Sequence, residues 1–466
     1  MSAGRTPLPL ANAPDWSSAS LPSDGRRHAI QPADVHGRFQ RARSLVYAAL
    51  IALWAALPWL RVRGHPALFV DVDARALYLF GTTFNAQDTW LLFFLLTGIG
   101  FALVVATAVA GRVWCGWACP QTVFLEGVFR RVERWIEGPR EERIRRNRGP
   151  WNAEKIARKV ATHALYAIGA VIVAHIFLSY FASLPATLRM VRQRPSAHPE
   201  AFGWVLAMSA VFYLNFAWFR EQLCVVLCPY GRLQSALLDK HSWVIGYDRR
   251  RGEPRGKKAT AGAGDCVDCK RCVVVCPTGI DIRNGTQLEC VACTACIDAC
   301  DDIMGKLGRP RGLIRYDSEE GLAGRRRRLV RPRLVFYAAL LVLGAVVALV
   351  AIRGRNDFEA TLLRLPGEPF VVEGDEVREA VQLHLVNKRA SEQRYRIDVE
   401  AEDAMRALVS IPTPRVSSLS DVRIPVFLSV SRHRFRSDLP FRIRISRDDG
   451  SGRPVVVSGM FLGPSG

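Results

Sequence analysis

Eight of the twelve cysteines in this chain fall in one short stretch, CVDCKRCVVVCPTGIDIRNGTQLECVACTACIDAC, which spans residues 266–300. The first four cysteines have the spacing C-x2-C-x2-C-x3-C, with Pro277 directly after the fourth. The second four repeat this spacing, but Asp301 stands where the proline would be. Three thiolates two residues apart can wrap around one iron–sulfide cluster, while the fourth lies beyond its reach. The pattern therefore predicts two [4Fe–4S] clusters.

Each predicted cluster takes three cysteines from one half of the stretch and the fourth from the other half. The first set is Cys266, Cys269, Cys272 and Cys300, and the second set is Cys290, Cys293, Cys296 and Cys276. A zinc ribbon is the usual alternative for paired C-x2-C motifs, but it would use four ligands and leave four cysteines idle. The crossed arrangement brings the two centres close together, which suits electron transfer.

The other four cysteines form two matched C-x3-C-P motifs, Cys115 and Cys119 before Pro120, and Cys224 and Cys228 before Pro229. Cysteines four residues apart on one helix share a face, with Cβ atoms about 5–6 Å apart. Soft thiolates of this kind suit Cu(I). The alternatives are a redox-active dithiol, an electron relay, or small buried residues at helix ends. Because the motif occurs twice, we expect these four cysteines to be catalytic and to bind metal.

Five uncharged apolar runs must position these motifs. A bilayer core needs roughly 17–25 helical residues, and each run is long enough, so we expect five transmembrane helices. The runs are residues 44–60, 89–111, 160–184, 201–219 and 334–352. Both C-x3-C-P motifs come directly after an apolar run, at the same end of the membrane.

The formal net charge of +21 could suggest nucleic acid, but its distribution argues against that partner. Lysine and arginine concentrate in residues 130–158 and 220–333, which are alternate loops between the apolar runs. Cytoplasmic loops carry this excess of positive charge. The rule places the cysteine-rich stretch in the cytoplasm, where thiols stay reduced, and the chain after residue 352 outside.

The C-terminal segment has a different pattern of apolar and polar residues. Stretches such as EAVQLHLVNK and PFRIRISRD alternate apolar and polar residues, as half-buried strands do. Six or seven such strands predict an immunoglobulin-like β-sandwich. The segment holds no cysteine and no catalytic constellation, so we interpret it as a docking module.

The expected fold is a polytopic α-helical membrane protein with a cytoplasmic bacterial-type 2[4Fe–4S] ferredoxin insert and a periplasmic immunoglobulin-like β-sandwich. The expected parts are a disordered cytoplasmic tail (1–43), a membrane domain with four transmembrane helices (44–243), the ferredoxin-like domain (244–333), a fifth transmembrane helix (334–352) and the sandwich (353–466).

The motifs WCGWACPQT, EQLCVVLCPYGRLQ and CPTGIDIRNGTQLECVACTACIDAC together resemble the CcoG family, also called FixG or RdxA. The resemblance extends over nearly the whole chain. It implies an inner-membrane iron–sulfur protein that assists assembly of cbb3-type cytochrome c oxidase by reducing Cu(II) to Cu(I). It also implies that the eight clustered cysteines are the cluster ligands and that the C-x3-C-P cysteines bind metal or pass electrons.

We therefore expect a cupric reductase with two [4Fe–4S] clusters and copper as its substrate or transient ligand. The expected partners are oxidase assembly factors, copper chaperones, an unidentified cytoplasmic electron donor and the lipid bilayer, without nucleic acid. Two other functions remain open at this point: a quinol-linked membrane ferredoxin that passes electrons to a respiratory partner, and a non-catalytic assembly scaffold. The expected location is the bacterial inner membrane.

Overall fold

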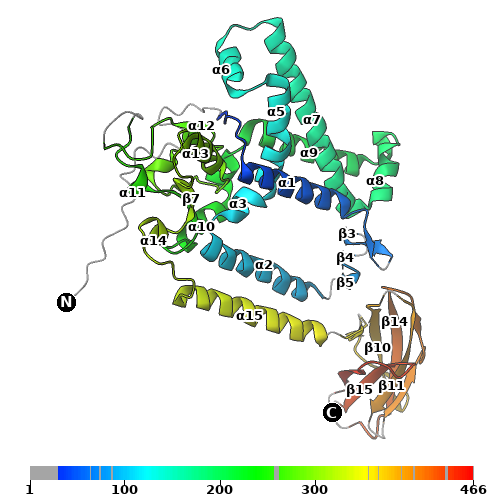
Figure 1. Cartoon of the computed structure of the whole chain (residues 1–466). Helices are drawn as coiled ribbons and strands as arrows, with labels where there is room; N and C mark the ends of the chain where they lie inside the picture. The colour runs from blue at the N-terminus through cyan, green and yellow to red at the C-terminus, as the bar shows by residue number, and fades with distance from the viewer. Residues whose placement is uncertain are drawn as a thin grey trace, which may run out of the picture. The chain divides into compact units, whose positions relative to one another are not determined.

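The computed structural model describes residues 30–464 except 63, 73–74, 85–87, 257–261, 355, 366, 390, 402–404 and 436–438. The chain divides into two compact units (Figure 1). Unit 1 consists of Met1–Val72 and Phe93–Ala345, and unit 2 of Asp73–Leu92 and Val346–Gly466. The cysteines all belong to unit 1.

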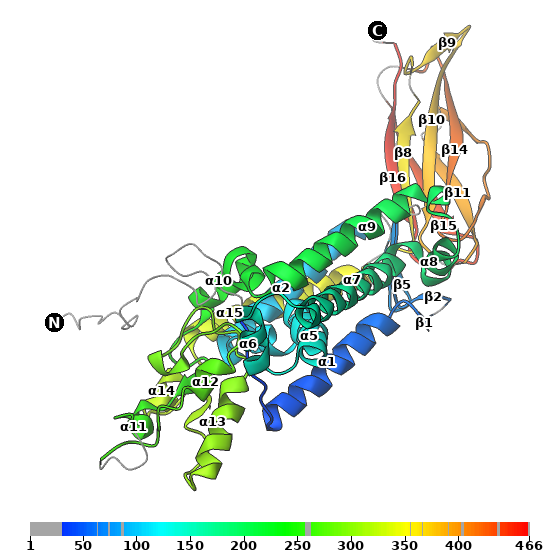
Figure 2. The ribbon, with the colours of Figure 1, turned by 90° about the horizontal axis from the view of Figure 1, so that it is seen from above.

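Four helices of the described chain are long and apolar enough to cross a membrane. They are α2 (Thr89–Ala110), α7 (Ala153–Ala182), α9 (Pro199–Tyr213) with its π-helical continuation η4 (Leu214–Phe219), and α15 (Pro332–Arg353). Helices α7 and α9 pack side by side (Figure 2). Within the described part of the chain, no side chain of α15 is buried. An apolar helix this exposed fits a lipid environment, and the four helices together indicate a membrane protein.

The first predicted span, residues 44–60, is not among these four. The structure has instead a helix α1 that begins at Arg38 and ends at Ala56. Its first turns carry Arg38, Arg41 and Arg43, and Arg43 is buried within the protein. The structure therefore supports four of the five predicted spans, and the N-terminal half of α1 packs against the cysteine-rich domain.

Short elements follow the second and fourth predicted spans, where the C-x3-C-P motifs lie. Those after α2 are α3 (Val113–Trp117), α4 (Pro120–Phe124), η2 (Leu125–Phe129), α5 (Arg130–Glu137) and α6 (Arg140–Arg148). Those after η4 are η5 (Leu223–Leu227) and α10 (Pro229–Leu237). A proline opens both α4 and α10, because the first helical position needs no N–H. The two motifs thus occupy equivalent places in the fold.

The cysteine-rich domain is closed by an antiparallel pair of strands, β6 (Val244–Tyr247) and β7 (Ile314–Asp317). Between and after them lie α11 (Arg249–Gly252), α12 (Arg271–Val274), η6 (Ile282–Asn284), α13 (Ala295–Lys306) and α14 (Glu319–Leu322). Its small core contains Ile297, Met304 and Ile314 together with buried cysteines. Thiol groups therefore replace part of the apolar core of this domain.

Residues 30–43 were predicted to belong to a disordered tail, and the structure differs there. The Ala33 amide donates to the Val274 carbonyl at 3.0 Å, and Ala33 packs with Val275 and Cys293. The carboxylate of buried Asp298 accepts hydrogen bonds from the first turn of α1, as a capping group would. This segment is part of the cysteine-rich domain, and residues 1–29 lie outside the described residues.

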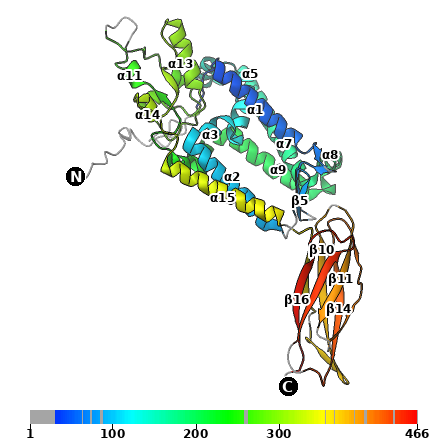
Figure 3. The same ribbon diagram turned by 60° about the horizontal axis from the view of Figure 1, so that its bottom comes forward.

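Unit 2 contains a β-sandwich of two antiparallel sheets (Figure 3). One sheet has the order β12-β14-β10-β8, with β9 also paired to β10, and the other has the order β13-β11-β15-β16. The strands are β8 (Phe358–Arg364), β9 (Val371–Glu373), β10 (Glu376–Asn387), β11 (Gln393–Ala401), β12 (Met405–Val409), β13 (Arg415–Val416), β14 (Asp421–Ser431), β15 (Leu439–Arg447) and β16 (Val455–Phe461). The predicted sandwich is therefore present.

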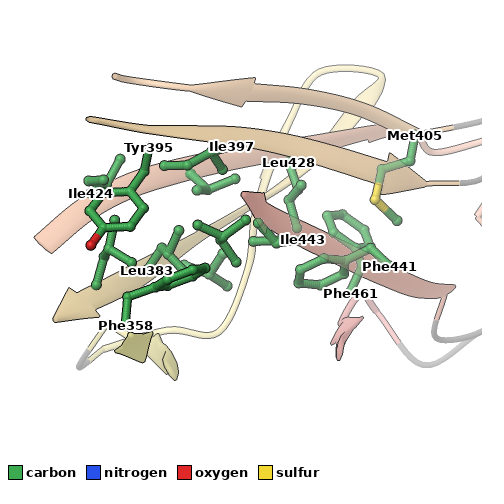
Figure 4. Packing of buried hydrophobic residues seen from close by; sticks show 14 of the residues in the cluster. Phe358, Leu383, Tyr395, Ile397, Met405, Ile424, Leu428, Phe441, Ile443 and Phe461 are labelled. Atoms are coloured by element: carbon green, nitrogen blue, oxygen red, sulfur yellow. The ribbon is translucent and has the colours of Figure 1, made fainter. Parts of the chain in front are cut away.

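Alternating side chains of both sheets meet in the sandwich core (Figure 4). Leu383, Tyr395 and Ile443 are fully buried there. The Tyr395 hydroxyl lies 3.1 Å from the amide oxygen of buried Asn387, which satisfies its polar end. This core needs no disulfide, since the alternation alone supplies two apolar faces.

The remaining elements are short connections. They are β1 (Arg61–Val62), β2 (His65–Pro66), β3 (Leu68–Asp71), β4 (Ala76–Leu79), β5 (Thr82–Phe84), α8 (Leu184–Val191) and η3 (Pro195–Ala197).

Candidate iron–sulfur and thiol sites

Two cavities inside the cysteine-rich domain collect the eight clustered cysteines. The first cavity is lined by Cys266, Cys269, Cys272 and Cys300. The second cavity is lined by Cys276, Cys290, Cys293 and Cys296, and also by Cys272. The fold thus brings together the two sets that the spacing predicts. The shared Cys272 shows that the cavities are neighbours.

Each cavity is bounded by a tight loop with the same unusual backbone. Asp268 and Lys270 have positive φ angles of 52° and 55°, and Ala292 and Thr294 have φ angles of 52° and 65°. These residues flank the second cysteine of each half in equivalent positions, and a helix begins directly afterwards. Alternation of left- and right-handed residues turns backbone N–H groups into a concave anion site, a geometry found at iron–sulfur centres. Non-glycine residues held this way cost about 1–3 kcal/mol each, and the spacing alone gave no sign of them.

Exposure differs between the two cavities. Cys269 of the first set is exposed, whereas Cys293 and Cys296 of the second set are buried. Burial raises the pKa of Cys293 to about 11 and that of Cys290 to about 12. Metal must bind these groups as thiolates, so loading releases protons.

The four C-x3-C-P cysteines form a second group of neighbouring thiols. Burial is the largest cause that raises the pKa of Cys115 to about 11 and that of Cys224 to about 12, and the neighbouring thiols of the group contribute to both increases. The Cys115 thiol donates to the Oε1 atom of Gln234 at 3.3 Å. Gln234 is completely buried, and its Nε2 atom has no hydrogen-bond partner among the described residues.

The local geometry of these motifs differs from the prediction of one shared helix face. Helix α3 ends at Trp117, and Cys119 is the residue before α4 with extended backbone. Cys224 lies in η5, and Cys228 is the extended residue before α10. Proline disfavours helical backbone in the residue that precedes it, so each motif breaks the helix at its second cysteine.

Within the described residues, no three cysteine, histidine or acidic side chains are arranged to hold a single metal ion. Thiolates around one tetrahedral ion would each lie about 2.3 Å from it. Neither set of four cysteines that lines a cavity meets this requirement. The C-x3-C-P thiols are neighbours but do not form a closed single-ion site.

Helix α3 lies directly against the loop that carries Cys290 and Cys293. A Cβ atom on Gly116 would lie 2.5 Å from the carbonyl oxygen of Ala292. Helix α1 runs beside α3 (Figures 1 and 3). From it, Arg43 donates to the Cys293 carbonyl at 2.7 Å, and the Tyr47 hydroxyl donates to the Gly116 carbonyl at 2.6 Å.

Arg112 joins the same loop to the second C-x3-C-P motif. Its guanidinium donates to the carbonyls of Leu288, Cys290 at 3.3 Å and Gly231 at 3.0 Å. Gly231 lies in α10, and a Cβ atom there would be 2.8 Å from the Cys224 carbonyl. One side chain therefore contacts the backbone of two segments, the loop that contains Cys290 and the helix that follows Cys228.

A buried network of charges lies near these segments. Glu133 contacts Arg143 at 3.0 Å and Arg220 at 2.9 Å, and Arg130 contacts Glu126 and Glu221. These groups are buried or nearly so, and burial of charges requires such pairing. In the sequence, Arg220 stands shortly before the second C-x3-C-P motif, but no local pattern indicates its buried partner Glu133.

Comparisons with known proteins agree with this architecture. Residues 219–319 match the 4Fe-4S dicluster domain family, residues 91–139 match a 4Fe-4S binding domain family, and residues 348–464 match the IG-like fold at the C-terminal of FixG. Together with the four membrane-spanning candidates, these matches define a membrane-associated iron–sulfur protein of the electron-transfer class.

Relatives identify the family. Protein RdxA of Cereibacter sphaeroides is 36% identical over 424 residues, which cover 87% of this chain and 88% of the relative. Nitrogen fixation protein FixG of Rhizobium meliloti is 33% identical and covers 88% of each chain. Protein RdxB of C. sphaeroides is 35% identical over 84% of this chain and 85% of the relative. The chain belongs to the FixG/RdxA family.

Proposed function

We propose that this protein is a membrane-bound cupric reductase that holds two [4Fe–4S] clusters. Cys266, Cys269, Cys272 and Cys300 would hold one cluster, and Cys276, Cys290, Cys293 and Cys296 the other. The support is that the fold gathers these cysteines at two neighbouring cavities with nest-like loops. When bound, such clusters take up and release electrons at potentials set by charge, burial and hydrogen bonds to sulfur.

Copper is the proposed substrate, and the four C-x3-C-P thiols are its proposed site. Reduction adds one electron to Cu(II) and gives Cu(I), which soft sulfur ligands prefer. The observation that carries the proposal is the close packing of α3, which contains Cys115, against the backbone of residues 290–293. This packing supports a short path between the second cavity and the C-x3-C-P thiols.

The cellular setting extends the same proposal. The family member FixG is named a nitrogen fixation protein, and we propose that this chain serves the assembly of a cbb3-type cytochrome c oxidase by supplying Cu(I) to copper chaperones. The positive charge of residues 220–333 supports a cytoplasmic cysteine-rich domain and a periplasmic sandwich. A cytoplasmic protein would donate the electrons.

The proposed activity has a direct test. The protein is purified without oxygen, reduced with dithionite, freed of excess reductant and mixed with Cu(II) and a Cu(I)-specific chelator. We expect the chelator's colour to develop in proportion to the protein's reducing equivalents. Protein in which both the clusters and the C-x3-C-P thiols have been oxidised is the matched control and should give none. If the reduced protein forms no Cu(I) but quinol reduces the clusters of the oxidised protein, the quinol-linked function replaces this proposal.

A further inference from the structure

We propose that Arg43, Arg112 and Gly116 are positioning residues that hold the loop of residues 288–294 against α3. We call this contact between α3 and residues 288–294 the joint. It makes the second cavity, rather than the first, the neighbour of the C-x3-C-P thiols. The inference rests on the proposed function only where it treats those thiols as the copper site. The joint itself follows from the hydrogen bonds and the close backbone contact.

The contact at Gly116 leaves no room for a side chain. A Cβ atom at this position would lie 2.5 Å from the Ala292 carbonyl oxygen and 2.6 Å from that of Val291. Both obstructing atoms are backbone, so they cannot move aside as a flexible side chain could. The absence of a side chain therefore sets the distance between α3 and the loop, and Cys115 is the residue next to Gly116.

Two arginines supply the polar half of the joint. Arg43 is 3% exposed and donates to the Cys293 carbonyl and, through Nε, to the Gly116 carbonyl at 3.3 Å. Arg112 is 9% exposed and donates to the Leu288 and Cys290 carbonyls. Buried carbonyls need such donors, and charged donors form the stronger bonds. The guanidinium groups thus hold the loop from both ends.

Two aromatic side chains continue the joint. The Trp117 indole donates to the Tyr316 hydroxyl at 3.2 Å, and that hydroxyl donates to the Ala292 carbonyl at 3.0 Å. The Tyr316 bond to Ala292, like the bonds from Arg43 and Arg112, reaches the half of the stretch that contains Cys290 and Cys293. The first cavity differs, because its Cys269 is exposed. The two cavities therefore have unequal surroundings, one locked to α3 and the other open at the surface.

Gly116→Ala tests the joint in the full-length protein. We expect hydrogen–deuterium exchange of residues 288–294 to accelerate about tenfold, since the loop loses its support. The EPR signal of one of the two clusters should change shape at unchanged iron content, and Cu(I) formation should slow about tenfold because misplacement weakens coupling. Gly98→Ala is the matched control, because a Cβ atom there meets no atom within 4 Å.

Arg112→Lys provides a second variant that keeps the positive charge but loses the planar fork of N–H donors. If Gly116→Ala loses iron, hydrogen exchange and EPR of Arg112→Lys test the joint instead. Exchange rates and EPR spectra that equal those of the Gly98→Ala control in both variants would overturn the inference. Changed exchange and EPR spectra, in a protein whose wild type forms no Cu(I), would uphold the joint and refute the cupric reductase.

Discussion

Replacing Cys115 and Cys224 together with serine is expected to lower Cu(I) formation at least about 100-fold, because changes even around metal ligands cost 10–100-fold. One thiol is removed from each C-x3-C-P motif, and a hydroxyl is a hard ligand that binds Cu(I) poorly. The eight cysteines of the two cavities are untouched, so iron and sulfide content should equal that of the wild type. The measurement is the chelator assay, with iron and labile sulfide determined on the same sample.

The control for this variant is Ser235→Ala, a neighbouring change on α10 where the hydroxyl donates to the Arg232 carbonyl. It should reduce copper at the wild-type rate. If the double serine variant also does so with full iron content, the C-x3-C-P thiols are not the copper site. A variant without iron would show instead that these thiols serve the fold of the cysteine-rich domain.

Glu133→Gln is expected to destabilise the protein by about 3–5 kcal/mol, the usual cost of breaking a buried ion pair. Glu133 is 7% exposed, and its carboxylate contacts the guanidinium groups of Arg143 and Arg220. The amide would leave both cations without their negative partner. The measurement is thermal or denaturant unfolding in detergent.

Glu154→Gln is the matched control, because the side chain of Glu154 is 62% exposed where it contacts Arg158. Exposed pairs contribute only about 0.2–1 kcal/mol, so its effect should be small. Equal stability of the two variants would contradict the importance of the buried network.

The same carboxylate predicts a pH dependence. Burial opposes ionisation of Glu133, but Arg220 and Arg143 outweigh burial and hold its pKa below the usual value of 4.5. A group with a lowered folded-state pKa stabilises the protein above its unfolded-state pKa. This contribution is lost as the pH falls below about 4.5, and Glu133→Gln should remove that part of the acid sensitivity.

The features that follow from local spacing or composition could be predicted from sequence. The spacing of Cys266, Cys269 and Cys272 predicted a set completed by Cys300, and the first cavity is lined by these four. The alternation in residues 376–387 predicted a half-buried strand, and β10 is one. Such patterns work because a period of two or a three-residue spacing fixes the geometry locally.

The features that depend on distant contacts could not be predicted. Arg43 looked like a charge ahead of a membrane span, yet it donates to a carbonyl 250 positions away. Residues 30–43 are polar enough to suggest a tail, but Asp298 and Val274 hold them. The helix break at Cys119 is a local effect of Pro120, and it separates the two cysteines that the spacing alone assigns to one helix face.

The measurement that tests the central claim most directly is EPR of the dithionite-reduced, oxygen-free protein during a titration with Cu(II). The account predicts signals of reduced [4Fe–4S] clusters that disappear in step with added copper, while no Cu(II) signal accumulates until the clusters are oxidised. Reduced-cluster signals that persist beside a growing Cu(II) signal, or a protein without such signals at all, would contradict it.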